Sequence, residues 1–481
     1  MGITPIQRQS LITLILTISL TGIGFLSTIY FAHTLGPAPL GAYFLFLAYF
    51  GTLNLLGDGG FGGAAIKRIS EGKEQDEYFS AFVFLRILLV AVSVPVLLVA
   101  EPYLKDLSSS GIFLWLLFAL IVSVFSSITG MGVYGIGKVG VHQISAFLDM
   151  FLRIIFQIIA VFLGFNIAGL AGGFVAGMVV GGIVNFRYLE LRLVRFRFGH
   201  LKSLFSFSFW IFLTTSGSLV FNYADTILIG YFMGNADVGV YRTAFQLTSV
   251  ATFTTLTLHT VLYPKISNWE AKGNITAIEY ALSQAFTYSL LLAIPVCIGG
   301  WIFGERLLYF LYGASFVGGT SALYLLLLVQ VANVFMYLGT MCLNALNRPK
   351  DAFWVTAFAS IANILLNIAL IPILGITGAA LATLISMTLN AIVALYLLSN
   401  IIRVKLEHRP VKNIVLASCA MGVLLLLIHL IFPPNHVIIL LGVVVAGAGM
   451  YFFLLLRLDT EIREKIRSIS DNLRLPWPRW I

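Results

Sequence analysis

Residues 352–399 read AFWVTAFASIANILLNIALIPILGITGAALATLISMTLNAIVALYLLS, and this stretch decides the fold. It contains no Lys, Arg, Asp or Glu, and a short GITG turn divides it into two long apolar runs. A helix needs about 20 consecutive apolar residues to cross the hydrocarbon core of a bilayer. The stretch therefore predicts two membrane-spanning helices, 352–373 and 376–399.

The composition extends this interpretation to the whole chain. Of the 481 residues, 59% are hydrophobic and only 10% are charged, whereas a soluble domain carries about 25% charged residues. So few charges exclude a soluble globular protein, a disordered chain and a nucleic-acid binder that uses its whole surface. The three cysteines all fall in apolar runs, so we expect neither a disulfide framework nor a zinc site, and no cofactor.

A window of about 20 residues finds fourteen candidate spans. The runs are continuous rather than alternating, which favours helices over an outer-membrane barrel. We therefore predict an all-α polytopic membrane protein. The predicted spans are 11–31, 40–60, 79–100, 111–133, 143–163, 167–186, 205–229, 239–262, 281–303, 321–344, 352–373, 376–399, 413–432 and 436–456.

The basic residues predict the orientation. With the N-terminus in the cytoplasm, all but five of the 29 Lys and Arg residues fall in cytoplasmic segments. Of the five, Lys105 and Arg306 lie in outer loops, and Arg86, Arg153 and Arg242 lie within spans. This asymmetry places both termini in the cytoplasm and the chain in the cell membrane. It also explains the net charge of +9 without nucleic acid, since anionic lipid headgroups are sufficient partners.

The segment 457–481 follows the last span. Apolar residues recur there at helical spacing with basic residues between them, which predicts an amphipathic helix on the cytoplasmic membrane surface. A frayed polar tail is the alternative. The residues that carry the pattern are Ile462, Arg463, Lys465, Ile466, Arg467, Ile469, Leu473, Trp477 and Trp480.

Two outer turns repeat along the chain, which indicates a duplicated six-span unit. The segments after Ile29 and Ile227 align at an offset of 198 residues, and a weaker pair, NIAG at 166 and GITG at 375, occupies equivalent turns. Like-oriented copies are a transporter pattern. We therefore predict two pseudo-symmetric six-helix lobes, 1–203 and 204–405, a helix pair 406–456 and the tail 457–481. The aligned residues are Gly36 with Gly234, Ala38 with Ala236, Gly41 with Gly239, and Tyr43 with Tyr241.

Small and amide residues within the spans predict close helix packing. Gly169, Gly173, Gly177 and Gly181 recur every four residues, a spacing that lets two helix backbones approach. Asn333, Asn344, Asn363 and Asn367 either bind sugars or hold helices together, and we favour the second role.

Ionisable residues within spans are costly and usually face a cavity or a partner. Asp149 and Arg153 are four residues apart, so they share a helix face and can pair. Each candidate also has a structural alternative: Arg86 can snorkel to the headgroups, the charged pairs can be purely structural, and Asp58 can simply end a helix. The candidate site residues are Arg86, Arg153, Asp149, Arg242, Asp225 and Asp58.

The segment LGPAPLGAYFLFLAYFGTLNLLGDGGFGGAAIKRISEG, residues 35–72, resembles the start of the polysaccharide flippases. These belong to the multidrug/oligosaccharidyl-lipid/polysaccharide exporter superfamily. Residues 224–247, 262–274 and 347–386 resemble later parts of the same proteins. The resemblance implies transport of a polyprenyl-linked oligosaccharide from the cytoplasmic to the outer leaflet by alternating access.

The resemblance also implies how the cargo would be held. A sugar head needs a polar cavity, because each unpaired hydroxyl in hydrocarbon costs several kcal/mol. Cations in that cavity would attract the phosphate linker. We therefore expect a transporter without catalytic residues, serving surface polysaccharide or glycoprotein glycan assembly, with glycan-assembly enzymes as further partners. The alternatives are a drug or small-molecule cation antiporter of the same superfamily, or a membrane glycosyltransferase or polymerase.

Overall fold

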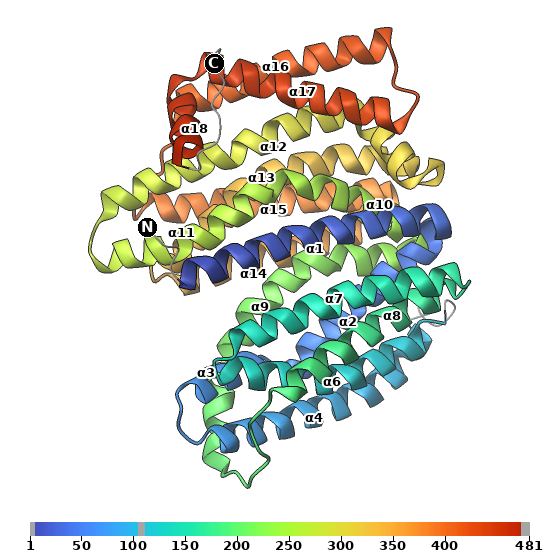
Figure 1. Cartoon of the computed structure of the whole chain (residues 1–481), viewed down its shortest axis with the longest axis vertical. Coiled ribbons are helices and arrows are strands. Elements are labelled where there is room, and N and C mark those ends of the chain that lie inside the picture. Colours follow the sequence, from blue (N-terminus) through green and yellow to red (C-terminus); the bar gives the residue numbers. More distant parts are fainter. Residues whose placement is uncertain (1–4, 104–110, 473–481) are drawn as a thin grey trace. The chain divides into compact units, whose positions relative to one another are not determined.

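The computed structural model describes residues 5–103 and 111–472, and within these residues the chain is helical and contains no strand (Figure 1). Long apolar segments form helices because a helix satisfies every backbone polar group internally. The principal helices are α1 (Pro5–Leu35), α2 (Pro37–Asp58), α3 (Phe61–Ser70), α4 (Gln75–Ala100), α6 (Phe113–Gly135), α7 (Val139–Phe162), α8 (Asn166–Arg187), α9 (Phe198–Phe232), α10 (Asn235–Thr248), α11 (Phe253–Ala271), α12 (Ile275–Tyr312), α13 (Thr320–Ala345), α14 (Pro349–Leu374), α15 (Ile376–Ser399), α16 (His408–Ile431), α17 (Val437–Leu458) and α18 (Thr460–Asn472).

The helices confirm an all-α polytopic membrane protein. Ten helical runs among the described residues are long and apolar enough to cross a membrane, and one of them, Pro349–Ser399, contains both α14 and α15. The count of fourteen spans remains a prediction. The expected span 239–262 is interrupted, since a 3-10 turn at Ser249–Thr252 separates α10 from α11.

Helices α11 and α12 overrun their expected limits. α11 continues to Ala271 and α12 to Tyr312, although we expected these two spans to end near 262 and 303. The extra turns remain helical because they carry residues that reach the core. Ile266 and Leu308 are both fully buried.

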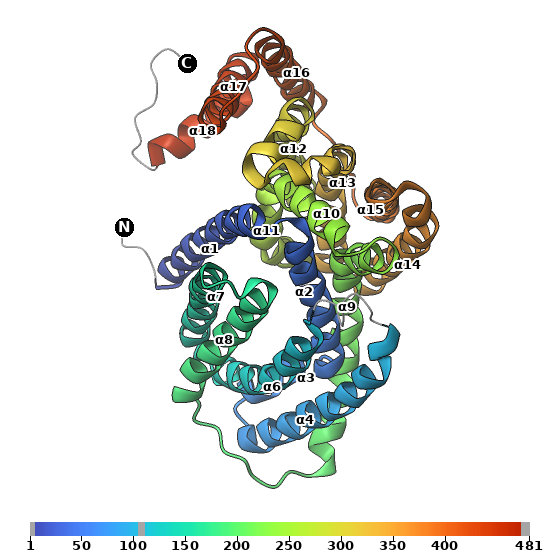
Figure 2. The same ribbon diagram turned by 90° about the vertical axis from the view of Figure 1, so that its right-hand side faces the viewer.

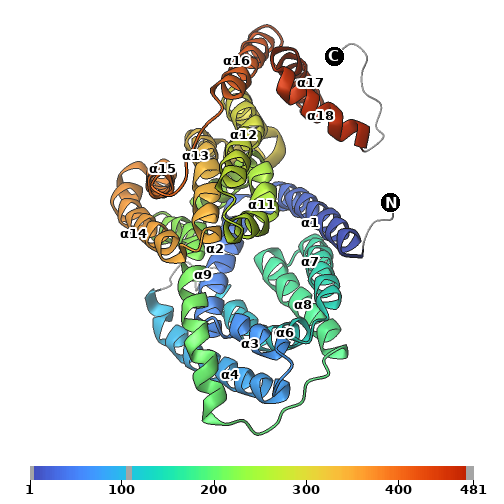
Figure 3. The same ribbon diagram turned by 90° about the vertical axis from the view of Figure 1, so that its left-hand side faces the viewer.

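The chain divides into two compact units, residues 1–242 and 243–481. In the first unit, α7 and α8 lie side by side (Figures 2 and 3). The glycine stripe of α8 makes this possible. A Cβ added at Gly173 would lie 2.5 Å from Cγ of Gln157, and one added at Gly177 would lie 2.6 Å from the backbone oxygen of Asp149. The predicted packing role of the stripe is confirmed.

The two repeated turns contact one another within the first unit. A Cβ added at Gly41 would overlap the backbone oxygen of Asn235, and a Cβ added at Gly239 would overlap the backbone oxygen of Pro37. The offset of 198 residues pairs Gly41 with Gly239 and Pro37 with Asn235. Such reciprocal contacts are what elements related by a twofold axis produce. The contact supports the repeat, while the lobe limits remain a prediction.

In the second unit, α16 and α17 pack against α12 through a core that includes Phe303, Ile414 and Leu440. The Tyr451 hydroxyl donates to the backbone oxygen of Leu291 at 2.8 Å. This bond fixes α17 against α12.

Within the tail, residues 460–472 form the helix α18, and its placement on the membrane surface stays a prediction. Ile462 is buried in the same core as α16 and α17. Lys465 donates to Oε1 of Gln284 at 2.7 Å, so it binds α18 to α12. Burial lowers the pKa of Lys465, but its bond with Glu461 and its contact with Tyr288 raise it, and the net shift is upward. Leu473, Trp477 and Trp480 lie outside the described residues.

Candidate functional site

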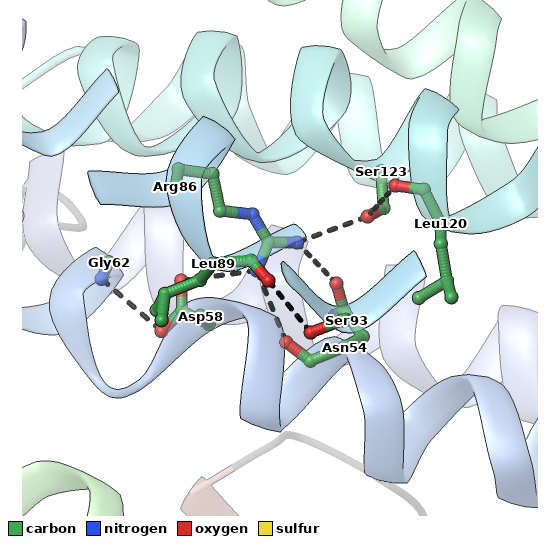
Figure 4. A network of polar contacts seen from close by, with 8 residues as sticks. All are labelled: Asn54, Asp58, Gly62, Arg86, Leu89, Ser93, Leu120 and Ser123. Carbon is green, nitrogen blue, oxygen red and sulfur yellow. Dashed lines mark hydrogen bonds and ion pairs between the residues drawn. The ribbon is translucent and has the colours of Figure 1, made fainter. Parts of the chain in front are cut away.

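Three clusters of polar side chains in the first unit contain all six charged residues expected within the spans. The first surrounds Arg86 on α4 (Figure 4). Its guanidinium donates to the backbone oxygen of Asn54 at 3.2 Å, to Oδ1 of the same residue at 2.5 Å and to Oγ of Ser123 at 3.1 Å. The side chain is 1% exposed. Arg86 therefore joins α2, α4 and α6, and in this structure it neither snorkels nor opens to solvent.

Asp58 belongs to the same cluster because α2 ends there. Gly59 and Gly60 follow with φ of 56° and 79°, left-handed values that glycine adopts without a steric penalty. The Asp58 carboxylate accepts the backbone N–H of Gly62 at 3.2 Å, at the start of α3, and its Oδ1 lies 4.0 Å from Nη1 of Arg86. It therefore ends one helix, starts the next and partly balances the Arg86 charge.

The second cluster runs along α7, on the face that the glycines of α8 cover. Nη2 of Arg153 donates to Oδ1 of Asp149 at 2.8 Å, which confirms the pairing that the spacing allowed. The guanidinium lies over the Phe174 ring, 4.4 Å from its centre. Unlike Arg86, both members remain accessible, with 23% of the Arg153 side chain and 21% of the Asp149 side chain exposed.

The polar row on α7 continues at Gln157, one turn beyond Arg153. Its amide donates to the Tyr43 hydroxyl and to the backbone oxygen of Leu170, both at 2.8 Å. Asp149, Arg153 and Gln157 thus occupy one helix face, with an ion pair at one end and an amide fixed to α2 and α8 at the other. Such a row can bind an anion through Arg153 and hydroxyl groups through Asp149.

The third cluster surrounds the turn between α9 and α10. Oδ2 of Asp225 accepts a hydrogen bond of 2.6 Å from the Tyr241 hydroxyl. Arg242 donates to the backbone oxygen of Asn222 at 3.2 Å and lies 5.8 Å from the centre of the Phe44 ring. Asp225 on α9 and Arg242 on α10 thus lie on the two sides of this turn, and the Tyr241 hydroxyl is a hydrogen-bond partner of Asp225.

Helices α14 and α15 of the second unit pack around a neutral polar group. The amide of Asn363 donates to Oγ of Ser386 at 3.2 Å, and the amide of Asn367 donates to Oδ1 of Asn363 at 3.1 Å. Both asparagines are at most 1% exposed. Asn363 thus joins α14 to α15, as we predicted. The same role for Asn333, Asn344 and Asn367 stays a prediction.

Sequence reasoning missed Asn54, Ser123, Gln157, Tyr43 and Tyr241. A helical-spacing search outward from the charges would have found two of them, since Asn54 precedes Asp58 by four residues and Gln157 follows Arg153 by four. Ser123 and Tyr43 come from different helices, and only the fold brings them near. Tyr241 precedes Arg242 directly but reaches Asp225 on α9 only in the fold. Across residues 5–103 and 111–472, no group of three His, Cys, Asp or Glu residues is arranged to hold a metal ion.

Comparison with protein families relates these clusters to known membrane proteins. The model of a family described as "Polysaccharide biosynthesis protein" matches residues 6–270, more than half of the chain. A second family model, MatE, matches residues 211–369.

Two curated proteins from Haloferax volcanii are similar over most of their length. "Probable low-salt glycan biosynthesis flippase Agl15" is 28% identical, over 87% of this chain and 88% of its own. "Probable flippase AglR" is 27% identical, over 97% of this chain and 99% of its own length.

Solved structures share the fold. The chain superposes on "Lipid II flippase MurJ, inward closed conformation" with a TM-score of 0.79 and 18% identity, over 92% of this chain and 98% of that one. An inward-facing multidrug resistance MATE family transporter of the MOP superfamily gives a TM-score of 0.64 and 17% identity, over 79% of this chain and 93% of the transporter chain. At these identities the likeness concerns the fold alone.

Proposed function

Because the chain belongs to the polysaccharide biosynthesis protein family, we propose that it is a flippase for a polyprenyl-phosphate- or pyrophosphate-linked oligosaccharide. It moves the sugar head from the cytoplasmic to the outer leaflet by alternating access, for surface polysaccharide or glycoprotein glycan assembly. The observation that carries the proposal is the partly exposed Asp149–Arg153 pair within the candidate span Val139–Phe162.

The cargo explains why a charged row belongs there. A lipid-linked sugar presents a phosphate and many hydroxyls, and each unpaired hydroxyl costs several kcal/mol in hydrocarbon. The Arg153 guanidinium matches a phosphate, because its fork of donors pairs with two oxygens at once. Asp149 keeps the charge balanced while the site is empty and accepts hydrogen bonds from sugar hydroxyls once phosphate engages Arg153.

Arg86 has a supporting role in this proposal. It is enclosed by Asn54 and Ser123 and it lies beside Asp58, where α2 meets α3. We assign it to fixing the glycine-rich junction rather than to contacting cargo. The Asp225–Tyr241 bond fixes the α9–α10 turn in the same way.

Alternating access also gives the contact of the repeated turns a role. Gly41 and Gly239 bring the first turns of α2 and α10 together in this structure. We infer from the positive-inside distribution that this crossing lies at the outer face of the cell membrane, with both termini in the cytoplasm. The crossing then closes the outer side of the pathway and opens to release the sugar head.

A cation antiporter of the same superfamily is the second candidate, and the MATE-like fold favours it. Such a protein needs a carboxylate available to its cargo. In this structure Asp149 is bonded to Arg153, Asp225 to Tyr241 and Asp58 to the Gly62 amide. The charges therefore favour an anionic cargo. A glycosyltransferase or polymerase is the weaker alternative, because the described turns at 163–165 and 233–234 are too short to carry a catalytic cluster.

The test is deletion of the gene followed by mass analysis of lipid-linked sugars. We expect a lipid-linked oligosaccharide to accumulate on the cytoplasmic side while glycan disappears from the surface. Normal surface glycan together with increased sensitivity to cationic drugs would contradict the flippase and favour the antiporter. Loss of the completed lipid-linked sugar itself would favour an enzyme.

A further inference from the structure

The segment 188–197, between α8 and α9, is extended rather than helical, and it is fixed to the start of α4 (Figures 2 and 3). The backbone N–H of Arg192 donates to Oδ1 of Asp76 at 2.9 Å, and that of Val194 donates to Oγ of Ser80 at 2.8 Å. Since α4 is a candidate span, these bonds hold the segment at the level where that span begins.

One side of the segment faces the protein. Leu189, Leu191 and Phe196 pack against the core formed by α3, α4 and the start of α9. The Phe196 ring lies 5.7 Å from that of Phe84. The opposite side of the segment therefore faces away from this core.

The opposite side of the segment, together with the first residue of α9, combines arginines with large apolar residues. We call this surface the basic ledge: Arg192, Leu193, Arg195, Arg197 and Phe198. All five are exposed, with Leu193 at 70% and Phe198 at 78%. A surface that faced only water would gain nothing from presenting two such side chains beside three positive charges.

Neighbouring acids do not neutralise the ledge. Glu190 pairs with Lys138 at 2.7 Å, and Glu74 contacts His200 at 3.1 Å. Asp76 accepts the Arg192 backbone N–H. In the part of the chain that the structure describes, the three arginines of the ledge form no ion pair within 4.0 Å.

We propose that the basic ledge is a docking surface for the anionic phospholipid headgroups of the surrounding bilayer. Its arginines bind lipid phosphates, and Leu193 and Phe198 insert among the upper acyl carbons. The level of the segment at the start of α4 fits this depth. Alternation of basic and apolar side chains is typical of protein surfaces that lie in a membrane interface.

The test compares two triple variants of the full chain, purified in a neutral detergent. R192Q/R195Q/R197Q removes three charges from the ledge. R403Q/K405Q/R409Q removes three exposed charges from the segment 400–412 and serves as the matched control. The probe is fluorescent phosphatidylglycerol, with phosphatidylcholine as the uncharged reference, titrated at low and high salt.

Each basic residue near an anionic surface raises the lipid affinity about fivefold. We therefore expect the ledge variant, which loses three such residues, to bind phosphatidylglycerol on the order of a hundredfold more weakly. The control should lose much less, and phosphatidylcholine binding should not change. L193S/F198S should weaken both lipids, with no dependence on salt.

Equal losses in both triple variants would overturn the proposal, because the affinity would then reflect net charge alone. Unchanged affinity in the ledge variant would also overturn it and would favour a protein partner. Competition by millimolar inorganic phosphate would show a phosphate site rather than a lipid surface. R192K/R195K/R197K keeps the three charges and should keep most of the affinity, so it separates the loss of charge from misfolding of the segment. The binding assay does not depend on transport, so its failure leaves the flippase proposal intact.

Discussion

Arg86 and Arg153 are both arginines within apolar helices, yet their surroundings differ. Arg86 is 1% exposed and is held by Asn54 and Ser123. Arg153 keeps 23% of its side chain exposed and has one carboxylate partner, Asp149. Burial of a charge is tolerated only where hydrogen bonds replace water. Arg86 is therefore held within the protein by its hydrogen bonds, whereas Arg153 keeps part of its surface open, which is why we propose it as the residue that contacts cargo.

The bonds of Arg86 lead to a prediction about stability. Asn54→Ala removes the Oδ1 acceptor of the buried Arg86 guanidinium and keeps the backbone acceptor. It should therefore lower the free energy of unfolding by about 1.5–3 kcal/mol. In an Arg86→Met background the same substitution should cost much less, because no buried charge is left unpaired. Thermal unfolding in detergent measures both. Equal costs in the two backgrounds would show that Asn54 acts independently of Arg86.

Arg153 leads to a prediction about transport. Arg153→Ala should leave the protein folded but reduce glycan export roughly ten- to hundredfold, since a hydrogen bond to a charged group contributes about 1.5–3 kcal/mol. Quantified surface glycan in a deletion strain measures the effect.

Asp149→Asn is the informative control for Arg153. If Arg153 binds phosphate, this variant keeps export, because the cation is retained and the amide still accepts a hydrogen bond. If the pair is only structural, Asp149→Asn and Arg153→Ala should be equally harmful. That second outcome would remove Arg153 from cargo binding.

At the scale of helices, α7 and α8 pack as closely as their glycines allow. Gly173 and Gly177 of α8 face the backbone and the polar row of α7. Lipid supplies no hydrophobic drive between helices, so close backbone approach provides the attraction. The glycines therefore also set the position of Asp149 and Arg153.

A substitution pair tests this packing. Gly177→Ala places a methyl group 2.6 Å from the backbone oxygen and Oδ1 of Asp149, so it should destabilise the protein by about 1–3 kcal/mol. Gly442→Ala on α17 has nothing within 4 Å and should be neutral or stabilising by up to about 1 kcal/mol. Gly177→Ala should lower the melting temperature, and Gly442→Ala should leave it unchanged or raise it. A shared direction would mean that helix propensity, not packing, governs both sites.

These elements also show how far the sequence can predict the structure. The apolar runs predicted the helices, and the four-residue spacing predicted the Asp149–Arg153 pair. The break at Ser249–Thr252 was missed because hydropathy ignores local hydrogen bonds. Ser249 and Thr252 donate to backbone oxygens three residues earlier, at 2.7 Å and 3.0 Å, and such bonds compete with the helical pattern. The enclosure of Arg86 was missed because its partners lie on other helices.

At the scale of the whole molecule, the contact between the two repeated turns explains why the same glycine occurs in both. Gly41 and Gly239 are equivalent positions, and each is occupied by glycine because the other copy's backbone fills the space of a side chain. The two repeated turns therefore contact each other closely. If the proposed flippase works by alternating access, this junction must separate on the outer side.

Gly41→Ala tests both the junction and the orientation. The added methyl overlaps the backbone oxygen of Asn235, and backbone cannot rotate aside, so the two turns must move apart. Val238, on α10 beside the crossing, is fully buried. In whole cells, Val238→Cys combined with Gly41→Ala should react with a membrane-impermeant maleimide several times faster than Val238→Cys alone, as measured on the isolated peptide.

Gly22→Ala is the matched control for this experiment, because nothing lies within 4 Å of its added methyl, and it should leave the labelling rate of Val238→Cys unchanged. The side from which the reagent reacts decides the orientation. Faster labelling from outside agrees with an outer crossing and cytoplasmic termini. If labelling increases only in inverted vesicles, the crossing faces the cytoplasm, and the positive-inside assignment on which the direction of transport depends is wrong.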